Sequence, residues 1–305
     1  MTNLTIITYH YVRKIQNSKY PKIKGLEIDS FKGQLEYLEK NYKIIYPSDL
    51  INNKVKDLSD NLCLLTFDDG FKDHVEFVLP ELKKKNLKAC FFPPAAPIVE
   101  NTLLDVHALH FILAVTKDIS ELISELNLIC TKRGYSQSDI KNYWDKYAKS
   151  NEFDTKEVIY FKRMLQFVLP LKLRKEIIKN FFKKFLKESP NEFARKLYMN
   201  KDDLKILLNH GMYIGSHSYN HDWLNELSYE KQEIDISKSL EFLKDIGAPT
   251  KDWIMCYPYG SFNENTISIL KKKNCSYGFT TISGVANLEK NPLKLSRKDT
   301  NEFPK

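Results

Sequence analysis

The sequence predicts an α/β fold interrupted by a helical segment, and two patterns carry this prediction. Strand-like apolar runs alternate with helix-like segments in residues 4–92 and again in residues 211–300, as in an α/β domain. From about residue 101 to 200 the alternation stops and the periodicity becomes helical. We therefore predict one domain over residues 1–305 with a helical insertion at about 101–200, and a chain of 305 residues is long enough for a sizeable core.

The elements before the insertion follow in a simple order. Residues 4–9 read as a strand ending at His10, and Asp29 is a plausible N-cap for the helix after it. The next strand is predicted at residues 42–46 and ends at Pro47. Residues 62–67 form an apolar strand that is followed directly by charged side chains. A helix and a strand at residues 87–92 complete this part. After the insertion we predict strands at 212–215, 253–257, 277–281 and 293–295, with helices at 229–246 and 265–272.

The predicted insertion is basic and amphipathic. Residues 117–200 contain 18 Lys and Arg against 11 Asp and Glu, an excess of seven in a chain whose formal charge is +8. One helical stripe is apolar: Leu173, Ile177, Ile178, Phe181, Phe182, Phe185 and Leu186. We favour a core-facing stripe beneath a solvated basic face and expect no nucleic acid partner, while peripheral membrane contact through the basic insertion stays open.

Composition excludes several classes of protein. The five cysteines are odd in number and never form Cys-x-x-Cys, so they indicate neither a disulfide framework nor a zinc ribbon. No apolar run is long enough to span a bilayer, and the first residues lack the pattern of a signal peptide. We expect a cytoplasmic location.

Two carboxylates, Asp68 and Asp69, follow the strand at residues 62–67 and precede Gly70. Adjacent carboxylates repel each other unless a metal, an arginine or a shared proton lies between or beside them. A solvated acidic turn is the alternative, because Asp-Gly is common in turns. His217 and His221 offer the matching ligands: if the segment forms a helical turn, the i, i+4 spacing places both imidazoles on one face. A metal site of three protein ligands would need one more donor, which one of the two aspartates supplies.

Two further segments complete the candidate site. Tyr257-Pro258-Tyr259-Gly260 predicts a tight turn that directs a backbone N–H at a ligand oxygen. Arg297, after a short apolar segment, is a fixed cation and our candidate for orienting Asp68. Phe71, Tyr219 and Trp223 are candidates for packing against a sugar ring, with the protein core as the alternative.

The motifs Thr66-Phe67-Asp68-Asp69-Gly70, His217-Ser218-Tyr219-Asn220-His221 and Tyr257-Pro258-Tyr259-Gly260, in this order, resemble the polysaccharide deacetylases of carbohydrate esterase family 4, the NodB-homology group. Tyr9-His10 is similar to the start of the branch that contains the poly-N-acetylglucosamine deacetylases. The sequence departs from the family in two places: Ile254, Met255 and Cys256 stand shortly before the Pro-Tyr-Gly turn, where many family members have an arginine, and no histidine follows His221.

The resemblance implies a distorted (β/α) barrel that binds one divalent metal, most often Zn²⁺, through Asp69, His217 and His221. It implies Asp68 as the general base. It also implies that His10 takes the place of the missing late histidine as the acid. A hydrogen-bonded strand-end histidine is the alternative for His10, and His107 and His110 in the insertion are the other candidates for the acid.

The expected function is metal-assisted removal of an N-acetyl group from an N-acetylated sugar or glycan intermediate, either free or linked to a carrier. Two alternatives stay open: a sugar N-deformylase using the same site with a smaller acyl pocket, and a catalytically inactive sugar-binding module. The intact set Asp68, Asp69, His217 and His221 argues against the inactive module.

Overall fold

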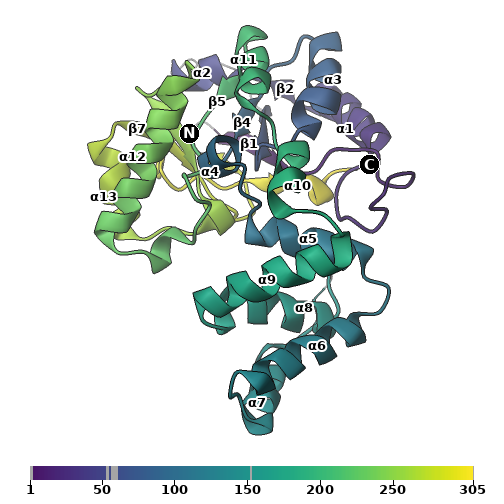
Figure 1. Cartoon of the computed structure of the whole chain (residues 1–305). Helices are drawn as coiled ribbons and strands as arrows, with labels where there is room; N and C mark the ends of the chain where they lie inside the picture. The colour runs from purple at the N-terminus through teal and green to yellow at the C-terminus, as the bar shows by residue number, and fades with distance from the viewer. Residues whose placement is uncertain (1–2, 53–54, 56–60, 152, 305) are drawn as a thin grey trace. The chain divides into compact units, whose positions relative to one another are not determined.

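A computed structural model describes residues 3–52, 55, 61–151 and 153–304. The chain divides into two compact units (Figure 1). The first comprises residues 1–14, 25–102 and 194–305, and the second comprises residues 15–24 and 103–193. In the described part of the chain, no helix has both the length and the apolar character needed to cross a membrane.

The sheet of the first unit is built on β1 (Asn3–Tyr9) and β3 (Leu62–Asp68), which pair in parallel from Leu4–Leu62 to Tyr9–Phe67. β3 pairs with β4 (Cys90–Phe92), and β4 pairs with β5 (Tyr213–Ile214), both in parallel. Every residue of β3 is buried, as expected for a central strand of a parallel sheet covered on both faces. β2 (Lys43–Ile44) is a short parallel neighbour of β3.

Parallel bridges carry the sheet onward into a ring. Ser216, just after β5, bridges Met255 in β6 (Trp253–Cys256), which pairs with β7 (Cys275–Phe279). Phe279 bridges Leu295, and β9 (Lys298–Asp299) pairs with β1. β8 (Ala286–Asn287) adds an antiparallel pairing to β1. The predicted α/β fold with a distorted barrel is confirmed, and the carboxyl ends of its strands share one rim, where barrel enzymes hold their active sites.

Helices accompany the strands of the first unit: α1 (Ile28–Asn41), α2 (Pro47–Ile51), α3 (Leu79–Lys84), α4 (Ala95–Glu100), α11 (Lys201–Asn209), α12 (Tyr229–Asp245) and α13 (Glu264–Lys272). Short turns of 3-10 or π geometry are η2 (His74–Val78), η4 (Leu224–Glu226), η5 (Pro258–Gly260) and η6 (Thr300–Glu302). One core cluster contains Phe31 and Leu35 of α1 together with Phe67 of β3 and Phe91 of β4. The buried side chains of α1 therefore pack against β3 and β4, the strands that position the site residues.

The second unit contains helices and no strand among its described residues. They are α5 (Asp105–Val115), α6 (Ile119–Lys132), α7 (Gln137–Tyr147), α8 (Lys156–Arg163), η3 (Met164–Val168) and α9 (Leu171–Leu186), with α10 (Pro190–Leu197) crossing into the first unit. Five residues of the apolar stripe in α9 are buried, as predicted for a core-facing helix: Ile177, Ile178, Phe181, Phe182 and Leu186. That residues 101–200 are an insertion into a single domain stays a prediction.

Four predicted elements differ from the structure. The N-cap of α1 is Glu27, while Asp29 lies in the first turn and pairs with Lys32 at 2.9 Å, so the prediction for Asp29 was wrong by two positions. No strand forms at residues 293–295, where Leu295 makes only an isolated bridge. The strands predicted at 42–46 and 87–92 shorten to β2 and β4, because strand ends depend on the neighbours they pair with and not on propensity alone.

Candidate active site

The two adjacent carboxylates lie at the carboxyl end of β3 and turn toward different partners. Asp68 is the last residue of the strand, whereas Asp69 has a positive φ of 71° and donates its N–H to the Phe92 carbonyl at 3.1 Å. Gly70 continues this turn with a φ of 66°, and a Cβ there would lie 2.7 Å from the Cβ of Pro93. Glycine is therefore required, and the turn separates the two side chains.

Asp68 is held by Arg297. The guanidinium donates from Nη1 to Oδ1 at 2.9 Å and from Nη2 to Oδ2 at 2.7 Å, a two-point pairing of two buried groups. Arg297 is itself fixed, because its Nε donates to the Thr280 carbonyl at 2.9 Å. Burial alone raises the pKa of Asp68, but the positive charge of Arg297 outweighs it and holds this pKa well below its usual value. Asp68 is therefore a fixed, ionised proton acceptor.

His217 and His221 come together, but not in the way the sequence suggested. Residues 217–221 form an irregular loop, so the predicted helical turn was wrong. Ser218 and His221 have positive φ values of 59° and 60°, which a helix does not allow. The Ser218 hydroxyl accepts the N–H of His221 at 2.9 Å and tightens the loop. The rings meet because the loop folds back on itself, with their centroids 4.8 Å apart.

Asp235, on α12, holds this loop by hydrogen bonds. Its Oδ1 accepts the backbone N–H of Tyr219 at 2.9 Å, and its Oδ2 accepts the backbone N–H of Asn220 at 2.9 Å and the side-chain amide of Asn220 at 3.1 Å. Two backbone donors between the histidines are thus satisfied by one buried carboxylate. Sequence reasoning missed this residue. A signal was present, since Gln232, Asp235 and Ser239 place polar side chains on the buried face of α12.

The residues present fit a divalent metal ion. The ligand atoms of Asp69, His217 and His221 all lie within 4.8 Å of one another and all three residues are buried. The Nε2 atoms of His217 and His221 lie 3.5 Å and 3.3 Å from Asp69 Oδ1. The Nδ1–H of His217 donates to the Cys256 carbonyl at 2.7 Å, which fixes the tautomer and leaves Nε2 as a lone-pair donor. Two imidazoles and one carboxylate are typical zinc ligands.

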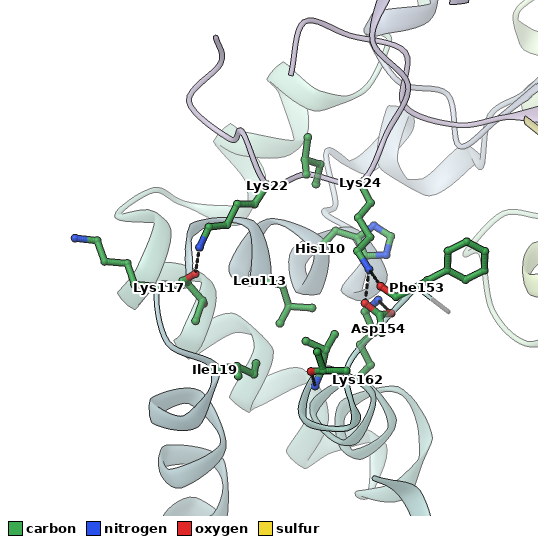
Figure 2. Close-up of a pocket in the computed structure, with 13 residues that line it drawn as sticks. Lys22, Lys24, His110, Leu113, Lys117, Ile119, Phe153, Asp154 and Lys162 are labelled. Atoms are coloured by element: carbon green, nitrogen blue, oxygen red, sulfur yellow. Dashed lines mark hydrogen bonds and ion pairs between the residues drawn. The ribbon is translucent and has the colours of Figure 1, made fainter. Parts of the chain in front are cut away.

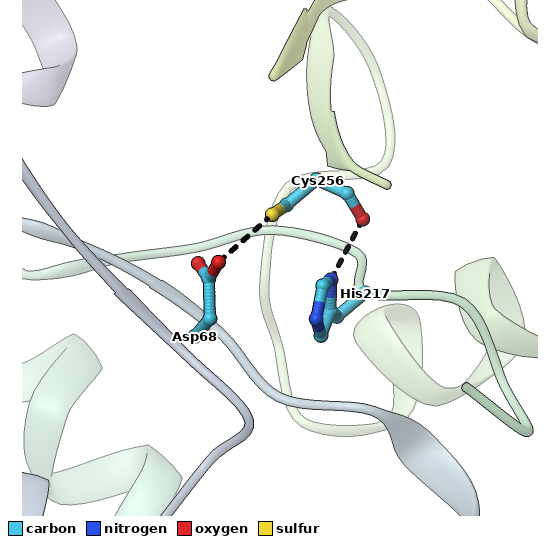
Figure 3. A group of neighbouring side chains, drawn as sticks. All are labelled: Asp68, His217 and Cys256. Atoms are coloured by element: carbon cyan, nitrogen blue, oxygen red, sulfur yellow. Dashed lines mark hydrogen bonds between the residues drawn. The ribbon is translucent and has the colours of Figure 1, made fainter. Parts of the chain in front are cut away.

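A second cluster shares His217 but is unsuited to a metal (Figure 3). It consists of Asp68, His217 and Cys256, with the Cys256 thiol donating to Asp68 Oδ2 at 3.4 Å. Burial raises the pKa of this thiol, so it stays protonated. Asp68 is already paired with the Arg297 cation. The metal ligands are therefore expected in the Asp69 cluster, and this second cluster shows that Asp68 lies beside it.

His10 lies at the same rim, directly after β1. Its Nε2 is 3.9 Å from Asp68 Oδ2, and 45% of its side chain is exposed. The backbone carbonyl of His10 accepts a 2.9 Å hydrogen bond from His74 Nε2. His74 is fully buried, and burial lowers its pKa to about 4. Neutral His74 therefore anchors the backbone that presents His10.

An aromatic surface borders the cluster of Asp69, His217 and His221. Trp223 stacks on Tyr259 with centroids 4.4 Å apart and planes 4° from parallel, and the Tyr259 ring meets that of His221 at 4.7 Å. Tyr219 is partly buried, and its hydroxyl donates to Glu100 at 2.7 Å. Phe71, by contrast, is fully buried and stacks against Tyr11 at 4.0 Å. Phe71 is therefore a core residue and not a sugar-packing residue, because no face of its ring is left for a sugar.

The remaining candidates lie in the second unit. His107 is buried in α5, and its ring centroid is 5.9 Å from that of His110. These two histidines belong to residues 103–193, whereas the site described above is built wholly from the first unit. The first unit thus brings together Asp68, Asp69, His10, His217, His221, Tyr259 and Arg297.

Comparisons in sequence agree with the motifs. The model of the family described as polysaccharide deacetylase matches residues 181–278, which include His217, His221, Asp235 and Tyr259. The putative polysaccharide deacetylase YxkH of Bacillus subtilis (strain 168) is 28% identical over 104 residues. That match spans 34% of this chain and 37% of the relative.

Comparisons in structure extend over nearly the whole chain. The Streptococcus pyogenes deacetylase PplD, solved in complex with acetate, superposes with a TM-score of 0.60 at 16% identity, covering 97% of this chain and 92% of that one. IcaB from Ammonifex degensii gives a TM-score of 0.56 at 17% identity over 98% and 92% of the two chains. A de-N-acetylase from Aggregatibacter actinomycetemcomitans gives 0.54 at 14% identity over 98% and 95%. The predicted resemblance is confirmed: the chain matches the polysaccharide deacetylase family in sequence over residues 181–278 and has the fold of solved deacetylases.

Proposed function

We propose that the protein is a metal-dependent hydrolase that removes the N-acetyl group from an N-acetylated sugar or glycan intermediate, with Zn²⁺ as its metal. One observation carries the proposal. A cluster of Asp69, His217 and His221 lies beside a second carboxylate, Asp68, that Arg297 holds ionised. Amide hydrolysis needs both parts, one to activate the carbonyl and one to take a proton. The family match and the deacetylase fold support acetyl as the acyl group.

Each residue has one task in the proposed reaction. A divalent ion, when bound, would act as a Lewis acid that polarises the acyl carbonyl. Asp68 accepts the proton of the attacking water, and its pairing with Arg297 keeps both oxygens in place. The backbone N–H of Tyr259 donates to the oxyanion that develops on the substrate. His10 then delivers a proton to the departing amine.

The sugar is proposed to lie against the Trp223–Tyr259 pair. Each ring of this nearly parallel stacked pair keeps only its outer face, which is flat and apolar, and the C–H face of a pyranose suits such a face. We also propose a carrier-linked sugar as the natural form of the substrate, and the cytoplasm as its location. The test below includes carrier-linked and free sugars.

The proposal is tested by loading the protein with Zn²⁺ and supplying N-acetylglucosamine as a free oligosaccharide, a nucleotide-linked sugar and a lipid-linked sugar. Release of free amine and of acetate is measured in parallel, with N-formyl analogues as a comparison. The wild type should release both products in equal amounts. Asp68→Asn should lose this activity and keep its zinc, while a His217→Ala, His221→Ala double variant should lose the zinc itself.

The matched control is Asp245→Asn, an exposed residue of α12 that pairs with Lys201. This variant should release amine at the wild-type rate. If no N-acetylated sugar releases amine from the zinc-loaded wild type, or if Asp68→Asn remains active, the proposed function is wrong. If only N-formyl sugars react, the deformylase alternative replaces it.

A further inference from the structure

The second unit contains a cavity that the proposed function does not use. Its volume is about 350 Å³, at the lower end of the size of small-molecule sites in proteins. The lining comes from the segment 15–24, from α5 and from the region around α8. Every lining residue belongs to the second unit, so the cavity is a property of that unit by itself.

One wall of this cavity is a neutralised ion cluster. Asp154 Oδ2 lies 2.7 Å from Lys162 Nζ, and Asp154 Oδ1 lies 2.5 Å from Lys24 Nζ. The Lys24 ammonium also donates to the Phe153 carbonyl. Figure 2 shows Lys24 and Asp154 joined in this way at one side of the cavity. These contacts tie the segment 15–24 to α8, and they use the one acidic side chain that the described part of the lining contains.

The opposite wall has positive charge without a matching acid. Lys22 Nζ donates to the Thr116 carbonyl at 3.1 Å, a neutral acceptor, so two of its three donors remain for another partner. Lys117, the residue after Thr116, is exposed. Within the described residues its ammonium has no hydrogen bond or ion pair. Among the described residues of the lining there are four lysines and one aspartate, which leaves three surplus positive charges.

Between the two walls the lining is aliphatic. Leu113 and Ile119 lie between the Lys22 contact and the Lys24 contact in Figure 2, and Ile23 and Val158 add to the same lining. An anion alone leaves these side chains facing water, and an apolar molecule alone leaves the lysines unmatched. A ligand with both parts satisfies both, because apolar burial and charge pairing then act together.

We propose that this cavity binds a phosphate monoester of an aliphatic alcohol, with the phosphate at Lys22 and Lys117 and the chain against Leu113 and Ile119. A dianionic head group matches the surplus charge better than a single carboxylate does. The chemistry is shared by soluble alkyl phosphates and by the head groups of phosphatidic acid. Binding here is independent of deacetylation.

The test is calorimetric titration of the zinc-loaded protein with inorganic phosphate, ethyl, butyl and hexyl phosphate, and hexanol. Affinity should rise about fourfold for each added methylene until the cavity is filled. Lys22→Gln, Lys117→Gln should weaken hexyl phosphate at least tenfold with an unchanged melting temperature. The control Lys132→Gln, Lys179→Gln removes two exposed lysines of α6 and α9 that do not line the cavity and should bind as the wild type does.

Three results would overturn the proposal: hexanol binding as tightly as hexyl phosphate, an affinity that does not change with chain length, or equal binding by both double variants. Sedimentation with vesicles of phosphatidylcholine, with and without phosphatidic acid, then identifies the source. Cosedimentation that needs both phosphatidic acid and the two lysines assigns a membrane lipid. Binding of hexyl phosphate without cosedimentation assigns a soluble phosphate monoester.

Discussion

Replacing Asp235 with asparagine is expected to weaken zinc binding although Asp235 is not a ligand. Its two oxygens accept three hydrogen bonds from Tyr219 and Asn220, in the loop between the two histidines. An asparagine keeps one oxygen and presents an N–H₂ group to a backbone donor. At least one hydrogen bond to a charged acceptor is lost, about 1.5–3 kcal/mol, and the bonds that remain lose their charge assistance.

Part of this loss should appear in metal affinity, because the same loop sets the positions of His217 and His221. Removal of a residue that orients metal ligands typically costs about 10- to 100-fold in affinity, and we expect the Kd for Zn²⁺ to rise by that factor. The assay is competition for Zn²⁺ with a chromophoric chelator, with the melting temperature of the metal-free protein measured in parallel. Asp245→Asn, on the same helix, is the control.

A zinc Kd in Asp235→Asn within twofold of both the wild type and Asp245→Asn would refute this reasoning. The loop would then hold its shape through Ser218 and the barrel alone. A lower melting temperature without any change in zinc affinity would lead to the same conclusion, since it would show that Asp235 stabilises the fold and does not position the ligands.

Three further predictions concern the rim. Arg297→Ala leaves the buried Asp68 without its cation and should lower the free energy of unfolding by about 3–5 kcal/mol; denaturant titration should also show that adding Asp68→Asn recovers part of this loss, and independent, additive effects would contradict the pairing. His10→Ala should keep its zinc and lower kcat by about 10² to 10⁴, whereas a larger loss in His107→Ala or His110→Ala would place the acid in the second unit. Burial lowers the pKa of His74 from 6.5 to about 4, so the unfolded chain takes up the proton first as the pH falls. The wild type should therefore lose about 3 kcal/mol of stability between pH 6.5 and pH 4 relative to His74→Gln, and equal pH dependence of the two proteins would show that His74 titrates normally.

The parts of the fold that follow from local pattern were predictable. β3 and the apolar stripe of α9 each show an uninterrupted signal over a whole element, and both occur as predicted. β8 and β9, which no sequence pattern predicted, are only two residues long, so their existence depends on their pairing with β1. No residue pattern of that length determines a strand.

The site shows the same division. The residues that meet in it were identifiable because each follows a strand predicted from the sequence, and strand ends share a rim. The conformation of the loop at 217–221 was not, because a spacing of four also suits a helix. The hydroxyl of Ser218 and the carboxylate of Asp235, 16 residues beyond Tyr219, decide this conformation. Cys256 was missed as a neighbour of Asp68 for the same reason, since its contact spans 188 residues.

The pairing of Asp68 with Arg297 has a consequence for synthesis on the ribosome. The two residues are 229 positions apart, so at 5–20 residues per second roughly 10 to 50 s pass between them. β1 and β3 can pair during this interval, but the Asp68 carboxylate has no cation and must stay hydrated. The segment that bridges Phe279 at Leu295 and pairs with β1 at Lys298 brings Arg297 to the rim. In a nascent chain, Asp68 is therefore not held in place as a proton acceptor until the segment that contains Arg297 docks.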